Sequence, residues 1–154
     1  MTSEKTPVTS RPRTLLAFDY GKKRIGVATG QELTCTASAL TTLHSVQEKP
    51  DWAGIKDLMD TWKPDALVIG MPYHMDGTEQ EITRAARRFG RQLHERFQVP
   101  VFEMDERLSS REAEDRIIEE RAHGHRKKMK KEDIDMLAAQ IILQDWFTQQ
   151  SGNT

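Results

Sequence analysis

The stretch from Leu15 to Ala28 constrains the fold of this chain more than any other. An apolar run, Leu15–Phe18, ends on the acid Asp19, a glycine and three cations follow, and a second apolar run begins at Ile25. Two such runs joined by a short glycine-containing turn are typical of a pair of antiparallel strands. Because the first run does not alternate between polar and apolar residues, we expect it to be buried on both faces of a sheet.

The rest of the chain predicts a sheet covered by helices. Strands are expected at 14–19, 24–30, 34–41, 66–70 and 99–103, and helices at about 51–63, 78–97, 109–120 and 132–147. Asp51 is a suitable N-cap for the first helix, and the segment Thr78–Glu81 has the form of a capping box for the second. A helix between two strands implies a parallel crossover. The pattern therefore predicts a mixed five-stranded sheet of order 3-2-1-4-5, which is a ribonuclease H-like α/β fold.

Composition limits the function classes. The 154 residues carry a formal net charge of -1, so any polyanion must be bound by a local patch rather than by bulk charge. One cysteine, Cys35, allows no disulfide framework, and we expect it to be buried. No apolar run is long enough to cross a bilayer, so we expect a soluble cytoplasmic protein without a membrane partner. We predict one domain at 14–148, with flexible tails at 1–13 and 149–154.

Three acids stand at informative positions. Asp19 ends the first strand, Glu106 follows the last strand, and Asp135 lies in the first turns of the last helix. Ligands of open α/β sheets collect at the carboxyl ends of parallel strands. Three carboxylates gathered there would repel one another unless a divalent cation bound them, and Mg²⁺ prefers such oxygen ligands. Metal ions held in this way promote phosphodiester hydrolysis. The alternatives are a turn residue for Asp19, a solvated loop acid for Glu106 and a helix-dipole acid for Asp135.

Two basic features are open to more than one interpretation. A stripe on the second helix, Arg84, Arg87, Arg88 and Arg91, is best interpreted as a solvated face. The run from Arg121 to Lys131 contains no acid, and we expect it to form an exposed loop available to phosphates. It contains no aromatic residue, so it would contact the nucleic-acid backbone rather than read bases.

Four blocks of the chain, in order, resemble the signatures of the YqgF/RuvX family. They are Phe18–Ala28, then Val68–Pro72 with Asp76–Glu79, then Asp105–Ser110 with Glu112-Ala113, and finally Ile134-Asp135 with Ala138-Ala139 and Ile141–Leu143. These bacterial proteins are related to Holliday junction resolvases, and a nuclease activity on pre-16S rRNA is proposed for them. The blocks span nearly the whole predicted domain.

The resemblance implies a ribonuclease H-like fold, a Mg²⁺ or Mn²⁺ site, and maturation of the 5′ end of 16S rRNA. Asp19, Glu106 and Asp135 match the family's catalytic acids. Because the strand ending at Gly70 carries no acid where related resolvases have a glutamate, that role falls to Glu106. We expect nucleic acid to be bound by Lys22, Lys23, Arg24, Arg107, Arg126, Lys127, Lys128, Lys130 and Lys131.

The sequence therefore predicts a metal-dependent endonuclease acting on pre-16S rRNA. The alternatives are a Holliday junction resolvase that cleaves branched DNA, and a non-catalytic nucleic-acid-binding factor in ribosome assembly or transcription. Both a monomer and a homodimer remain open.

Overall fold

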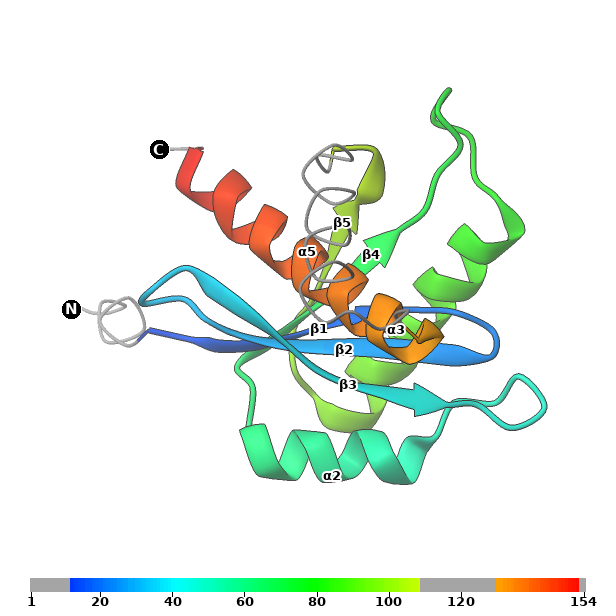
Figure 1. Cartoon of the computed structure of the whole chain (residues 1–154), viewed down its shortest axis with the longest axis horizontal. Helices are drawn as coiled ribbons and strands as arrows, with labels where there is room; N and C mark the ends of the chain where they lie inside the picture. Colours follow the sequence, from blue (N-terminus) through cyan, green and yellow to red (C-terminus); the bar gives the residue numbers. More distant parts are fainter. Residues whose placement is uncertain (1–11, 109–129, 153–154) are drawn as a thin grey trace.

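A computed structural model of the chain describes residues 12–108 and 130–152 (Figure 1). Its strands are β1 (Thr14–Asp19), β2 (Arg24–Gln31), β3 (Thr36–His44), β4 (Ala66–Met71) and β5 (Val101–Asp105). They form one sheet in the order β3-β2-β1-β4-β5. β1 pairs antiparallel with β2 and parallel with β4, and β5 is parallel to β4. The predicted mixed sheet and its strand order are confirmed.

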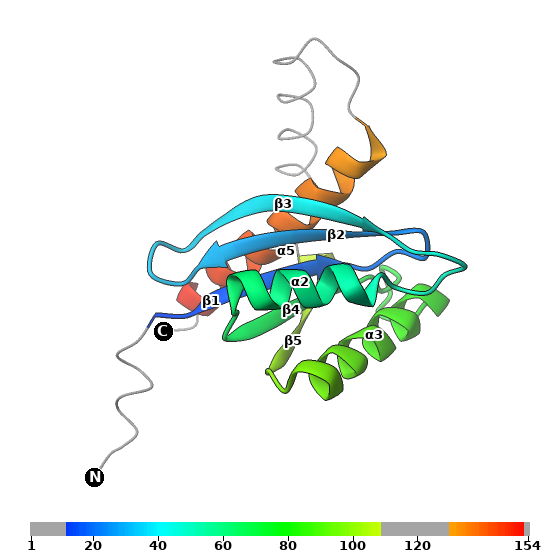
Figure 2. The ribbon, with the colours of Figure 1, turned by 90° about the horizontal axis from the view of Figure 1, so that it is seen from below.

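Helices cover both faces of this sheet. They are α2 (Trp52–Trp62), α3 (Glu81–Phe97), the short 3-10 helix η1 (Glu106–Leu108) and α5 (Lys131–Gly152). α2 and α3 lie on one face, and α5 crosses the other (Figures 1 and 2). No helix of the described part of the chain is long and apolar enough to span a membrane.

The double-sided burial of β1 explains its unbroken apolar sequence. Leu16 and Phe18 point into the core formed with α2 and α3. Leu15 and Ala17 point into the second core, which α5 closes with residues such as Leu143. Successive strand residues face opposite sides of a sheet, so a strand that divides two cores needs apolar residues at every position.

Several boundaries differ from those predicted. α3 begins after the N-cap Gln80 rather than at Thr78, because Gln80 and Thr83 form the capping box. The Thr78 hydroxyl instead donates a hydrogen bond to Asp76 Oδ1, at 2.7 Å, within the preceding turn. β5 starts two residues later than expected. The last helix continues to Gly152, beyond its expected end and into the segment predicted to be a flexible tail.

One further expectation is wrong. Cys35 is exposed, in the turn between β2 and β3, and has a positive φ of 53°. Arg13, assigned to the N-terminal tail, forms an ion pair of 2.7 Å with Glu32, and its guanidinium lies 5.7 Å from the Trp146 ring centroid. The predicted helix at 109–120 and most of the basic run at 121–131 lie outside the described residues.

Candidate functional site

Asp19 lies at the carboxyl end of β1, on the face of the sheet that α5 covers. The alternation along β1 places Leu15 and Ala17 in the core with α5, so Asp19 shares their side. Its side chain is half-buried, and its partner in the antiparallel register is Gly26 of β2. The strand that divides the two cores thus ends with a carboxylate on the α5 side.

Glu106 reaches the same face from the end of the edge strand β5. It follows β5 directly, and its half-buried carboxylate lies against Gly70 of β4. A Cβ built on Gly70 would be only 2.9 Å from Glu106 Oε2. Gly70 is one residue beyond Ile69, which pairs with Phe18, so it lies on the strand beside Asp19. The missing side chain of Gly70 therefore makes room for an acid next to the end of β1.

Asp135 comes from the second turn of α5. Its backbone carbonyl lies so close to Gly26 that no Cβ fits between the two. Its side chain accepts a hydrogen bond of 2.6 Å from Arg24 Nε, and both side chains of this ion pair are largely buried, with 21% and 27% exposure. Because Gly26 faces Asp19 across the β1–β2 pair, the helix turn bearing Asp135 is brought to the end of β1.

The predicted basic residues near the acids have different surroundings. Lys22 forms an ion pair of 3.0 Å with Glu81, which raises the pKa of Lys22 and lowers that of Glu81. Lys23 is exposed. Arg24 is engaged with Asp135, so the structure gives it a carboxylate partner where phosphate was expected.

Arg107 is fixed beside the site rather than pointing freely into solvent. It forms an ion pair of 2.7 Å with Asp105, and its guanidinium lies 5.4 Å from the ring centroid of Tyr73. The hydrogen bond from Arg107 holds the pKa of the Asp105 carboxyl below its usual value. This pairing directs Asp105 toward Arg107.

The late basic run is described only at its end. Lys130 and Lys131 are exposed at the start of α5. Arg126, Lys127 and Lys128 lie outside the described residues.

The donor types at this rim suit a hard divalent cation. Asp19 and Glu106 supply the carboxylate oxygens that Mg²⁺ or Mn²⁺ would take, and the space at Gly70 is filled by one of them. The third acid is held by Arg24. Within residues 12–108 and 130–152, no group of three His, Cys, Asp or Glu side chains is arranged to hold a metal ion. The donor chemistry fits a metal, whereas the three-acid arrangement would require Asp135 to turn toward the other two.

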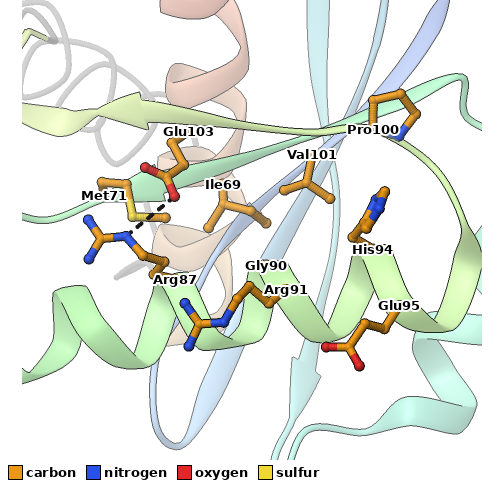
Figure 3. A pocket seen from close by; sticks show the side chains of 10 residues that line it. All are labelled: Ile69, Met71, Arg87, Gly90, Arg91, His94, Glu95, Pro100, Val101 and Glu103. Carbon is orange, nitrogen blue, oxygen red and sulfur yellow. Dashed lines mark ion pairs between the residues drawn. The ribbon is translucent and has the colours of Figure 1, made fainter.

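A well-formed hollow lies on the opposite face of the sheet. It has a volume of about 520 Å³ between α3 and the strands β4 and β5, with Ile69 and Val101 at its floor (Figure 3). Arg87 and Glu103 form an ion pair of 3.5 Å across its edge. Since the side chains at 69, 101 and 103 point away from α5, this hollow is separate from the acids.

Sequence reasoning missed the glycines that build the site. Gly26 and Gly70 are interior strand residues, and both are places where another group approaches the backbone closely. Glycine inside a strand pattern is a known signal of such an approach. Tyr73, which lies under Arg107, carried no comparable signal.

Known proteins resemble this chain over most of its length. Residues 13–149 match the family RuvX, described as Holliday junction resolvase. A protein of Saccharophagus degradans named "Putative pre-16S rRNA nuclease" is 46% identical over 137 residues, which cover 89% of this chain and 94% of the relative. A protein of the same name from Nitrosococcus oceani is 48% identical over 145 residues, covering 94% and 92%.

Solved structures resemble this chain at the level of the fold. T. thermophilus RuvC in complex with a Holliday junction substrate aligns with a TM-score of 0.57 at 13% identity, covering 90% of this chain and 96% of that one. The likeness confirms the predicted ribonuclease H-like fold. With the match over residues 13–149 and the curated relatives, these findings show that the chain belongs to the RuvX family.

Proposed function

We propose that this protein is a divalent-metal-dependent endonuclease that processes the 5′ end of pre-16S rRNA. The observation that carries the proposal is the approach of two carboxylates, Asp19 and Glu106, to neighbouring strand ends on one face of a RuvX-family sheet. The names of the curated relatives support the ribosomal substrate. Such a substrate would place the protein in the cytoplasm.

In this proposal each acid has a separate task. Asp19 and Glu106 would hold Mg²⁺ or Mn²⁺, which when bound supplies an activated water and stabilises a leaving oxygen. Asp135 would join them from α5, with Arg24 fixing the orientation of its carboxylate.

Basic side chains around the rim would bind the RNA backbone. Lys22, Lys23 and Arg107 surround the ends of β1 and β5, Lys131 begins α5, and Lys130 directly precedes it. Arg126, Lys127 and Lys128 precede them in the sequence. Phosphate contacts of this kind position a substrate without reading its sequence.

A matched pair of amide substitutions tests the catalytic role. Glu106→Gln removes the acid at Gly70, and Glu103→Gln makes the same change three residues earlier, on the opposite face. Cleavage of pre-16S RNA with Mg²⁺ should fall by at least about a hundredfold in the first variant and stay near that of the wild type in the second. Equal activity of the two variants would contradict the proposal.

Metal binding is measured separately from cleavage. Isothermal titration with Mn²⁺ should give a binding signal for the wild type and for Glu103→Gln, and a weakened one for Asp19→Asn. Circular dichroism of each variant establishes that it is folded. Unchanged Mn²⁺ affinity in Asp19→Asn would exclude this acid as a ligand.

A DNA junction resolvase is the second candidate, because the family itself is described as Holliday junction resolvase. A four-way DNA junction incubated beside the RNA precursor separates the two substrates. Preferential cleavage of the junction would favour the resolvase. Binding of RNA without cleavage under any metal condition would favour a non-catalytic assembly factor. Light scattering of the same samples would distinguish a monomer from a homodimer.

A further inference from the structure

A second hollow, which we call the α2–α3 groove, lies on the face of the sheet away from the acids. It has a volume of about 360 Å³ and is lined by Tyr20, Lys49, Trp52, Arg88 and Arg96, among others. Tyr20 follows Asp19 directly, and adjacent residues at a strand end face opposite sides of a sheet. The groove therefore begins at the same edge of the sheet as the candidate site.

Aromatic rings and a guanidinium lie close together in this groove. The Trp52 ring lies 5.6 Å from that of Phe89, centroid to centroid, and the Arg96 guanidinium lies 3.9 Å from the Trp52 centroid on a side chain that is exposed. Tyr20 belongs to the same cluster, with its ring centroid 5.2 Å from that of Phe89 and the two rings tilted by 38°. Because the Arg96 side chain is exposed, its guanidinium is accessible beside the Trp52 ring, and a nucleobase can stack on a guanidinium plane.

The charge of the groove distinguishes it from the larger hollow of Figure 3. Lys49, Arg88 and Arg96 line the α2–α3 groove with a single acid, Glu48. Within the described residues, none of these three cations takes part in an ion pair. In the larger hollow, by contrast, the acids Glu95 and Glu103 accompany the arginines (Figure 3). Uncompensated cations beside a stacking plane suit a single-stranded polyanion.

We infer that the α2–α3 groove binds a single-stranded stretch of RNA, with one base stacked on Arg96 and the backbone phosphates at Arg88 and Lys49. This inference rests on the proposed function in one respect: the bound RNA segment is taken to be the part of the RNA next to the position that the candidate site cleaves. RNA leaving the ends of β1 and β4 passes over the edge of the sheet at Tyr20 and enters the groove. The four-arginine stripe of α3 thus divides into two sides, since Arg88 faces this groove and Arg91 faces the other hollow.

The test uses a fluorescein-labelled, unstructured oligoribonucleotide of about twelve nucleotides and fluorescence anisotropy without a divalent metal. Arg96→Glu and Arg88→Glu should each weaken binding about tenfold or more. Arg96→Lys keeps the charge but removes the planar group, and should lose most of the same affinity. In Arg88→Glu, the slope of log affinity against log salt should fall by about 0.7, since each lost phosphate contact to a single strand contributes about 0.7.

The matched control is Arg91→Glu, which makes the same charge change on the same helix but on its other side. It should change the affinity less than about twofold. Equal losses in Arg91→Glu and Arg88→Glu would overturn the inference, because binding would then follow the overall charge of α3. Unchanged affinity in a folded Arg96→Glu variant would also overturn it.

Failure of the proposed function would look different. Asp19→Asn leaves the groove intact and should bind the oligoribonucleotide as the wild type does, whether or not the protein cleaves RNA. If the Arg88→Glu and Arg96→Glu variants both cleave pre-16S RNA and bind the oligoribonucleotide normally, the proposed nuclease function stands and the RNA-binding role of the groove is refuted. If the wild-type protein never cleaves pre-16S RNA but both variants lose oligoribonucleotide binding, the RNA-binding role of the groove stands and the proposed nuclease function is refuted.

Discussion

Substitution of Gly70 by alanine separates the role of the candidate site from the stability of the fold. A Cβ at this position would lie 2.6 Å from Ile142 Cδ1 and 2.9 Å from Glu106 Oε2. Ordinary contacts begin at 3.4 Å, so the isoleucine methyl must move by at least 0.8 Å (3.4 − 2.6) and the carboxylate oxygen by at least 0.5 Å (3.4 − 2.9). Both atoms are at the ends of flexible side chains.

The two displacements have unequal consequences. Repacking of one methyl group costs about 1–2 kcal/mol in the free energy of unfolding, which lowers Tm by roughly 3–6 °C in a chain of this size. If Glu106 is a catalytic acid as proposed, displacement of its carboxylate by half an ångström or more should reduce cleavage about ten- to a hundredfold. The Gly70→Ala variant should therefore remain folded and lose most of its activity on pre-16S RNA.

The control is Gly90→Ala in α3. A Cβ there meets only Val101 and Ile69, at 3.5 and 3.6 Å, and this glycine is helical. Alanine should stabilise the helix by about 0.5–1 kcal/mol and leave cleavage unchanged. Differential scanning calorimetry and single-turnover cleavage measure the two properties. A folded Gly70→Ala variant with the activity of Gly90→Ala would refute the placement of Glu106 in the site.

Further predictions concern the docking of α5 and the ends of the sheet. Gly26→Ala should destabilise the fold by about 3 kcal/mol or more, measured by urea unfolding, because its Cβ would overlap the rigid backbone carbonyl of Asp135. Arg24→Gln should lower the free energy of unfolding by about 1–3 kcal/mol in the same assay, since it leaves a largely buried carboxylate without its ion-pair partner. The hydrogen bond from Arg13 lowers the pKa of Glu32, so this acid stabilises the fold above the unfolded-state pKa, and that contribution is lost as pH falls through the lowered value. Glu32→Gln should therefore reduce the stability difference between pH 6 and pH 3; an unchanged difference would show that the pair makes no such contribution.

The strands could be predicted because the residue pattern that indicates a strand lies within the strand itself. The unbroken apolar run of β1 indicates burial on both faces, and the acid that ends it marks the rim. Local reasoning fails where two signals compete. Thr78 fits the sequence pattern of an N-cap, but its hydroxyl and its backbone amide both donate hydrogen bonds to Asp76 Oδ1. The helix therefore starts after Gln80. The turn at Cys35 places a small apolar residue in solvent because its left-handed backbone directs the chain back into β3.

The meeting of distant segments was harder to predict. Arg24 and Asp135 are 111 residues apart, and nothing in either sequence segment specifies the other. Asp19 and Glu106 were expected at one rim from strand order alone. The space that admits Glu106 depends on Gly70, which could have been identified only by asking what approaches a glycine inside a strand.

The two ends of α5 are held in different ways, and this difference bears on how the third acid reaches the site. The far end is fixed by apolar packing, with Leu143 and Phe147 lying against Gly30 of β2. The end bearing Asp135 is fixed by backbone contact at Gly26 and by polar contacts, among them the ion pair with Arg24. Polar contacts at a partly exposed helix end exchange with solvent and ions at lower cost than a packed core does. The structure therefore has two carboxylates at the ends of β1 and β4 and a third held beside them by Arg24. In the proposed function, the Asp135 side chain would change partner while the helix keeps its place on the sheet.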